Sequence, residues 1–310
     1  MNIFRFIQII TCMILTSTAA AQHYAYQPST PIIGKIQTIQ ARSYDTFEQL
    51  ARTHDIGYDE LLHANPDINP YKIPPGTVMI LPTHYILPQA PHRGIVVNLP
   101  EKRLYVYRSH RVYTFPIGIG RAGWTTPVGQ LRIISKQKNP AWYVPKAVRA
   151  TQAELGNPLP AVVPAGPNNP LGDYALRLSK SNYLIHGTHD PSGVGKRSSA
   201  GCLRMYPEDI KRLYHMIPIN TPVTIIKQPL KTAQVGSQFW VESHSPLIEM
   251  MDDHNRNDGA HLEPTLSLNE TLDHLMKDMR QAHITPHSKA YLRMLLNDSS
   301  GLPLLAGRIL

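Results

Sequence analysis

Proline is the residue that most limits how this chain can fold. The 310-residue sequence contains 28 prolines, and each one fixes φ and removes a backbone N–H donor, which breaks long helices and central strands. Between them lie short alternating apolar segments such as 103–108 and 111–117. Short alternating segments bounded by Pro and Gly indicate many short strands. We therefore expect a mostly β protein whose helices are short.

The first 21 residues are typical of a secretory signal peptide. Arg5 precedes an apolar run over 7–15, and a series of small residues ends at Ala21, which is the order of a charged region, a hydrophobic region and a cleavage site. The run is too short to span a bilayer, although a short buried helix would also fit it. We expect residues 1–21 to be removed on export, and the mature chain to lack a transmembrane segment.

The chain has two cysteines, Cys12 and Cys202, too few for a disulfide framework or a cysteine-rich zinc site. Removal of residues 1–21 would discard Cys12 and leave Cys202 alone in a compartment where thiols are normally paired. A lone cysteine in such a chain indicates an intermolecular disulfide or a reactive thiol.

Residues 36–84 have the pattern of a small α+β unit with its own core. Strands are expected at 36–41 and 78–81, and helices after Thr46 and at 59–64, with Asn-Pro and Pro-Gly turns between them. This βααβ order resembles the LysM module, which binds glycans that contain N-acetylglucosamine. LysM modules usually carry glycine where this chain has Tyr44. The alternative is a spacer domain that binds no sugar.

A glycine motif follows the three strands expected, in meander order, between 95 and 117. The segment 118–123 reads Gly-Ile-Gly-Arg-Ala-Gly and matches GxGxxG, but a dinucleotide site needs a helix at the last glycine. The residues that follow Gly123 read instead as a turn and a strand. We expect a hairpin loop here.

Two residues carry the chemistry of a thiol nucleophile. His186 ends an expected strand, and Cys202 lies sixteen positions later among small residues. A neutral imidazole can remove the thiol proton and then stabilise the thiolate. Gly201 would let a substrate carbonyl approach main-chain N–H groups, and Arg204 could bind a carboxylate. Each residue alone could equally be structural, Cys202 as a small buried apolar group and His186 as a core histidine.

A metal site is a minor alternative, because His186, His189 and Asp190 lie close together in the sequence. Their spacing matches no zinc signature. We expect neither a metal nor an organic cofactor.

The segments 186–188 (His-Gly-Thr) and 199–204 (Ser-Ala-Gly-Cys-Leu-Arg) match the HGT and SxGCxR motifs of the YkuD-type L,D-transpeptidases. The chain resembles this family over residues 92–228, and most closely its periplasmic branch with an exported N-terminus and a LysM-like unit. The resemblance implies a mostly β catalytic domain, a β-sandwich with short helices. Many relatives have histidine before the Gly-Cys pair, where this chain has Ala200.

The resemblance also implies a role for each motif residue. Cys202 is then the nucleophile, His186 the base, and Gly187 supplies the carbonyl that orients the imidazole. Arg204 binds the donor stem. Three further motif residues are expected to contact substrate: Gly201, Ser199 and Thr188.

The implied reaction is a two-step acyl transfer on peptidoglycan. Cys202 attacks the third residue of a tetrapeptide stem, D-alanine leaves, and an amine of another stem or of an outer-membrane lipoprotein opens the acyl-enzyme. Carbapenems are expected to acylate the same thiol. Hydrolysis of the same bonds, by an L,D-carboxypeptidase or an amidase, is the first alternative. A non-catalytic wall-binding protein is the second.

Residues 229–310 carry weaker signals. We expect a C-terminal extension made of a linker and a helical hairpin, with one helix opening at Ser267 and another over 288–296. The formal net charge of +9 favours an anionic partner. No basic segment interleaved with aromatic residues is present, so nucleic acid is not an expected partner.

Overall fold

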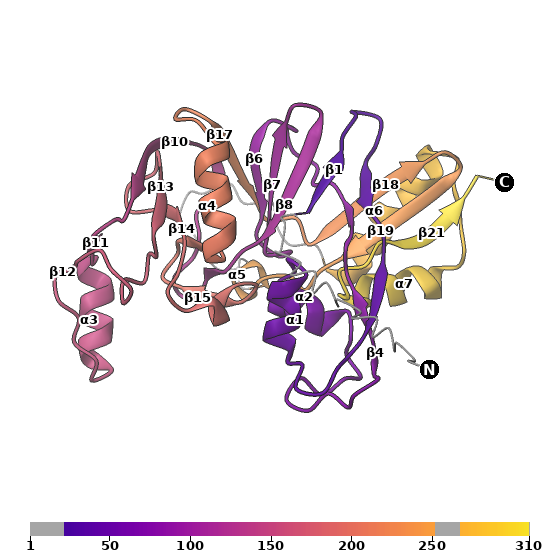
Figure 1. Ribbon diagram of the computed structural model, residues 1–310. Helices are drawn as coiled ribbons and strands as arrows, with labels where there is room; N and C mark the ends of the chain where they lie inside the picture. The colour runs from indigo at the N-terminus through magenta and orange to yellow at the C-terminus, as the bar shows by residue number, and fades with distance from the viewer. Residues whose placement is uncertain (1–21, 252–266, 310) are drawn as a thin grey trace, which may run out of the picture.

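The structure, a computed structural model, describes residues 22–251 and 267–309 (Figure 1). The expected signal peptide and Cys12 lie outside the described residues. Within them, no helix is long and apolar enough to cross a membrane.

One large sheet organises the molecule, and the mostly β expectation is confirmed. The meander of β6, β7 and β8 is antiparallel, as expected from the sequence, whereas β6 with β17 and β14 with β16 are parallel pairs. The nine strands have the spatial order β1 (His23–Ala25), β8 (Arg111–Pro116), β7 (Arg103–Arg108), β6 (Gly94–Asn98), β17 (Pro222–Ile226), β10 (Gly129–Lys138), β13 (Tyr174–Leu178), β14 (Leu184–His186) and β16 (Leu203–Arg204).

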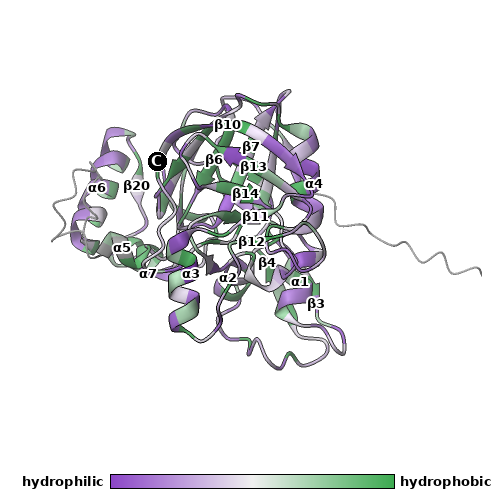
Figure 2. Cartoon of the chain, turned by 90° about the vertical axis from the view of Figure 1, so that its left-hand side faces the viewer, coloured by the Kyte–Doolittle hydropathy of each residue, from purple (hydrophilic) through white to green (hydrophobic). Residues whose placement is uncertain are grey.

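The core of this sheet is closed by α4 (Pro207–Met216), which begins with proline in its first turn. Ile210 and Leu213 on its inner face pack with Leu176 and Ile185 of the sheet in one buried cluster. Figure 2 shows hydrophobic strands at the centre and hydrophilic residues along the outer side of α4. The strand that carries His186 is thus fixed between the sheet and α4.

The expectation of a hairpin loop at the glycine motif, residues 118–123, is wrong. The strands on either side of it, β8 and β10, are separated in the sheet by β7, β6 and β17. Residues of the motif instead form β9 (Ile119–Gly120), which pairs in parallel with β15 (Arg197–Ser199) just before Cys202. Turn residues show where a chain changes direction, but they do not show which strand it joins. No helix begins at Gly123, so the motif lacks the element that holds a pyrophosphate.

The LysM-like unit has the expected order β3 (Gln37–Gln40), α1 (Phe47–Thr53), α2 (Tyr58–His63) and β4 (Val78–Leu81). The Thr46 hydroxyl caps α1 by accepting the Gln49 N–H at 3.2 Å, and Phe47 and Leu50 are buried in the unit's own core. Tyr44 has φ +75° and is almost fully exposed, which explains why glycine suits this position.

The C-terminal segment contains the two expected helices, α6 (Leu268–Gln281) and α7 (Lys289–Asp298), and Ser267 forms the capping box of α6. In addition, a four-stranded sheet packs against them. Its order is β18 (Leu230–Val235), β19 (Gln238–Ser243), β21 (Leu304–Arg308) and β20 (Thr285–Pro286). Leu272, Leu275 and Val241 share one buried cluster.

The remaining elements connect these parts: β2 (Ile32–Gly34) pairs with β5 (His84–Ile86), β11 (Trp142–Tyr143) pairs with β12 (Val162–Val163), and single turns or helices lie at α3 (Lys146–Glu154), η1 (Pro191–Gly193) and α5 (Ile248–Met251). In Figure 1, α3, β11 and β12 project from one end of the large sheet, opposite the C-terminal helices.

Candidate active site

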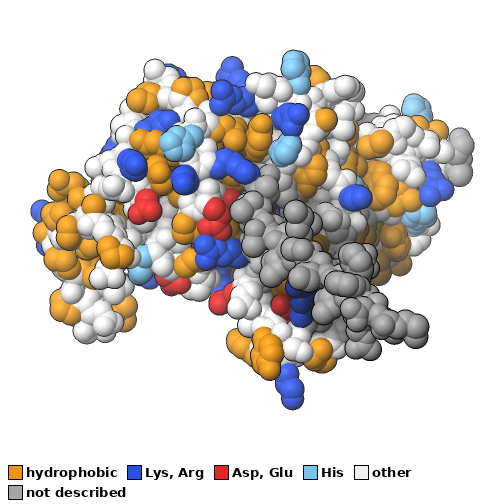
Figure 3. All heavy atoms as spheres, in the orientation of Figure 1, with side chains coloured by type: hydrophobic (Ala, Val, Ile, Leu, Met, Phe, Trp, Pro, Cys, Tyr) orange, Lys and Arg blue, Asp and Glu red, His pale blue; other side chains and the backbone are white. Residues whose placement is uncertain are grey.

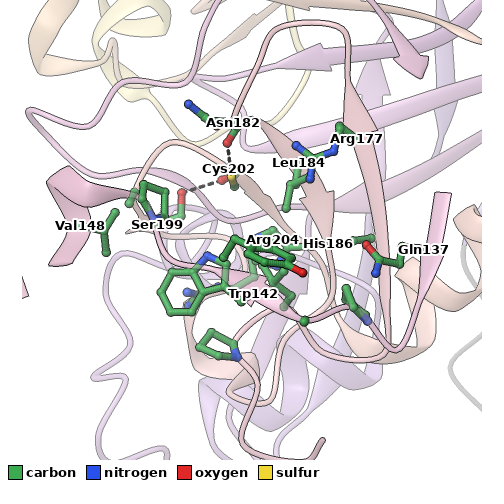
Figure 4. A pocket seen from close by; sticks show the side chains of 18 of the residues that line it. Gln137, Trp142, Val148, Arg177, Asn182, Leu184, His186, Ser199, Cys202 and Arg204 are labelled. Atoms are coloured by element: carbon green, nitrogen blue, oxygen red, sulfur yellow. Dashed lines mark hydrogen bonds between the residues drawn. The ribbon is translucent and has the colours of Figure 1, made fainter. Parts of the chain in front are cut away.

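The parallel pair β14–β16 brings His186 and Cys202 to the same part of the sheet. Its register places Ile185 opposite Leu203 and His186 opposite Arg204, so Cys202, just before β16, lies next to Leu184 at the start of β14. Cys202, His186, Ser199 and Arg204 line one cavity of about 410 Å³ (Figure 4). Gly187, Gly201 and Thr188 do not line it.

His186 is buried, and its Nδ1 lies 2.6 Å from the carbonyl oxygen of Gly187. Since a carbonyl can only accept, Nδ1 carries the proton and Nε2 is left as the basic nitrogen. Burial, together with the charge of Arg204, lowers the pKa of His186 to about 4, against the smaller opposing effect of the Gly187 carbonyl. The imidazole is therefore neutral at pH 7, as a general base must be.

The Cys202 thiol is half-buried and donates to the carbonyl oxygen of Asn182 at 3.6 Å. Burial raises the pKa of the thiol, and the charges of Arg177 and Arg204 partly oppose this effect. Among the described residues, no hydrogen bond joins the thiol to His186. The raised pKa favours the protonated thiol in the structure as it stands.

The turn before Cys202 is held by Ser199. Its hydroxyl donates to the Cys202 carbonyl at 2.6 Å and accepts the Gly201 N–H at 3.1 Å. Gly201 has φ +103°, and a Cβ there would lie 2.9 Å from the Tyr183 ring, so only glycine fits. Because the Gly201 N–H is already bonded to Ser199, it is not free to bind an oxyanion. The expectation of an oxyanion site must therefore rely on another main-chain donor.

Thr188 stabilises the other loop, the one that leaves His186. Its hydroxyl donates to the Asp190 carbonyl at 2.8 Å and accepts the Asp190 N–H at 2.9 Å. The side chain of Asp190 in turn binds Ser192. Thr188 and Asp190 thus act within the loop and do not face the cavity.

The cavity wall is positively charged. Arg121, Arg177 and Arg204 line it, and no Asp or Glu does. In the described part of the chain, neither Arg177 nor Arg204 forms an ion pair, and the buried Nε of Arg204 has no hydrogen-bond partner. Figure 4 shows the Arg177 guanidinium on the side of β13 that faces Cys202. Two guanidinium groups without carboxylate partners in the cavity of Cys202 are suited to bind an anionic ligand.

Sequence reasoning missed the part of the wall formed by the projecting arm of α3, β11 and β12. Trp142, Tyr143 and Val148 from this arm line the cavity, and its outer end exposes a hydrophobic surface that includes Tyr143 and Leu155 (Figure 3). Nothing local in the sequence marks these residues, because they are distant from Cys202 in the sequence and only the fold brings them to the same cavity.

The metal alternative gains no support from the geometry. Of the described residues, only Glu101, Glu242 and His244 place three potential ligand atoms within 4.8 Å of one another, and they lie away from Cys202. The buried ammonium of Lys231 contacts Glu101 at 2.9 Å and Glu242 at 2.6 Å, so a cation of the chain itself already contacts both carboxylates.

The LysM-like unit contacts the loop between His186 and Cys202. A Cβ on Gly195 would lie 2.2 Å from the Tyr58 nitrogen, which shows how closely the two backbones approach. Lys196 places its ammonium 3.7 Å from the centre of the Tyr58 ring and 3.1 Å from Glu48. The loop that leads to β15 and Cys202 is thus packed against the LysM-like unit.

Comparison with known proteins identifies two domains. Residues 92–225 match YkuD, the L,D-transpeptidase catalytic domain, and residues 41–82 match the LysM domain. The chain is 40% identical over 215 residues to "Probable L,D-transpeptidase YcfS" of Escherichia coli K12, covering 67% of each chain. It is 36% identical to "Probable L,D-transpeptidase ErfK/SrfK" of the same strain, covering 86% of this chain and 88% of the relative.

Among solved structures, the catalytic domain of the E. faecium L,D-transpeptidase acylated by ertapenem matches 45% of this chain and 100% of its own length. The sequence identity is 20% and the TM-score is 0.34.

Proposed function

This chain belongs to the YkuD family of L,D-transpeptidases and carries a LysM domain, and from that premise we propose that Cys202 is the nucleophile of an acyl transfer on peptidoglycan. The observation that carries the proposal is the pairing of β14 with β16. It puts a neutral, oriented imidazole and a lone thiol on one cavity, the combination that thiol catalysis needs.

In the first step, Nε2 of His186 takes the thiol proton, and the thiolate forms a bond to the carbonyl carbon of the third stem residue. The peptide bond after that carbon breaks, and the D-alanine amine leaves with the proton from His186. In the second step, an acceptor amine attacks the thioester, loses a proton to His186, and releases the Cys202 thiol.

The donor is proposed to be anionic. Stem peptides carry free carboxylates, and the cavity presents three arginines and no acidic side chain. Arg204 binds a donor carboxylate in this proposal, as the sequence predicted. The Gly187 carbonyl fixes the imidazole. Substrate contacts of Ser199, Gly201 and Thr188 remain predictions, because their contacts in the structure are with the main chain of the site.

We also propose export to the periplasm, glycan binding by the LysM domain, and an acceptor amine on a second stem or on an outer-membrane lipoprotein. Figure 3 shows many more Lys and Arg than Asp and Glu side chains on the face viewed, which favours a polyanionic wall.

The test combines intact-protein mass spectrometry with a turnover assay. A carbapenem should add once per chain, and tetrapeptide donor with an amine acceptor should give a cross-linked product. Cys202→Ala should abolish both, and His186→Ala should slow both by about two to four decades. A Cys202→Ala variant with full activity would overturn the mechanism. Product formed only with water would assign the chain to the carboxypeptidase alternative.

A further inference from the structure

A pair of buried carboxyl groups, neither of which lines the cavity described above, lies where the LysM unit meets the catalytic domain. Asp55 follows α1, and Asp209 lies in the first turn of α4; each is 4% exposed. Burial raises the pKa of both carboxyls, and the negative charge of Asp55 raises that of Asp209 further. Asp55 Oδ1 and Asp209 Oδ2 are buried and have no hydrogen-bond partner among the described residues.

The charges around this pair do not balance. Arg103 is the nearest cation, but its Nη2 and Nε are already bonded to Glu60, at 2.6 and 3.1 Å. One arginine therefore faces three buried carboxyl groups. Buried carboxylates are stable only with a compensating cation or a proton. Because burial raises the pKa of Asp209 well above its ordinary value, Asp209 keeps its proton. Asp55 and Glu60 then share one arginine, so the junction lacks one positive charge.

The backbone nitrogen of Gln22 supplies the missing contact. It lies 3.0 Å from Asp55 Oδ2. Gln22 is held there by its side chain, whose Nε2 donates to the His54 carbonyl at 2.8 Å and whose Oε1 accepts from the Tyr24 hydroxyl at 2.6 Å. The carbonyl of Gln22 accepts the Thr114 N–H at 3.0 Å, so this residue is fixed on both sides of its backbone.

Gln22 is also the first residue of the mature chain if the signal peptide is cleaved after Ala21, as the sequence predicts. We propose that cleavage turns this nitrogen into an α-ammonium that forms a buried ion pair with Asp55 and so completes the junction between the LysM and catalytic domains. A neutral amide with one N–H is thereby replaced by a charged group with three. This inference rests on the proposed export and cleavage, but it does not depend on transpeptidation.

The same arrangement makes a chemical prediction. A free N-terminal glutamine cyclises when its α-amine attacks the side-chain amide carbon and ammonia leaves. In the folded chain, the amine is directed to Asp55 and the amide to His54 and Tyr24. Cyclisation would abolish the charge, and we expect the folded mature chain to resist it.

The experiment compares two forms of the whole mature chain, one that begins at Gln22 with a free amine and one that carries two alanines before it. The extended form keeps the backbone N–H but not the charge. The free-amine form should melt about 5 °C higher, the effect of one charge-assisted hydrogen bond. Asp55→Asn, made in both forms, should remove the difference. Equal melting temperatures in the unsubstituted forms, or a difference that survives Asp55→Asn, would overturn the proposal.

Two further measurements keep the test decisive. Mass spectrometry of exported protein should show a chain that begins with uncyclised Gln22; another start, or a mass lower by one ammonia, would contradict the proposal. If Asp55→Asn does not fold, acetylation of the α-amine is compared in the folded and unfolded chain. Slow acetylation only when folded supports the ion pair, and equal rates refute it. Failure of the proposed function would appear separately, as absence of a carbapenem adduct on Cys202.

Discussion

The ion pair between Arg103 and Glu60 tests whether the LysM domain is fixed to the catalytic domain in solution. Arg103 comes from β7 of the large sheet and Glu60 from α2 of the LysM domain, and their side chains are 0% and 6% exposed. The guanidinium also donates to Thr114 Oγ1 at 3.0 Å and lies 4.4 Å from the centre of the Tyr85 ring. Glu60→Gln preserves the shape of the side chain, removes its negative charge and replaces one of the two oxygens that accept from Arg103 with an NH2 group.

The expected cost follows from the burial of Arg103. Removing one partner of a buried ion pair leaves an uncompensated charge and typically costs about 3–5 kcal/mol. Such a loss is a large fraction of a stability of about 5–15 kcal/mol. The Glu60 carboxylate also accepts the Gly57 N–H at 2.9 Å, but the glutamine oxygen can keep that bond. We therefore expect Glu60→Gln to destabilise the whole chain by about 3–5 kcal/mol.

Urea unfolding, followed by tryptophan fluorescence and circular dichroism, measures this loss. Glu208→Gln is the matched control, because Glu208 and Arg52 also join the two domains but are 32% and 44% exposed; its cost should be at most about 1 kcal/mol. Adding Arg103→Met to Glu60→Gln should recover most of the stability, since the unpaired charge is then gone. Equal effects of Glu60→Gln and Glu208→Gln would refute the buried junction.

Three more predictions concern the active site. Arg177→Gln should raise KM for donors with free carboxylates. It should also raise the pKa of Cys202 further, which is measured as the rate of iodoacetamide alkylation against pH. If both KM and the pH dependence of alkylation are unchanged, Arg177 does not act in this site. Gly195→Ala should destabilise the chain and slow carbapenem acylation, because the added Cβ would clash with the LysM backbone. Gly123→Ala is the control, since Gly123 also has positive φ but lies in open space, and it should not slow acylation. Equal acylation rates of the two variants would contradict the contact. Because the pKa of His186 is lowered to about 4, the imidazole stays neutral as pH falls through 6.5, and the acid limb of acylation should lie near pH 4 instead.

The sequence by itself determined the local chemistry of this protein. The motifs around His186 and Cys202 identified a family that the comparisons confirm. Each motif is a short run of neighbouring residues, so it can be recognised without knowing the fold. Alternating segments such as 103–108 and the cap at Thr46 likewise specified strands and helices within a residue or two, since periodicity and capping act over one or two turns.

Only the tertiary structure decided which distant segments meet. The glycine motif pairs with the strand before Cys202, Arg177 on β13 lines the same cavity as Cys202, and the N-terminal segment at Gln22 contacts Asp55. These contacts join residues far apart in the chain, and no pattern near either partner encodes the register that brings them together. They follow from burying one continuous core, which leaves each buried charge only the partners that the packing supplies.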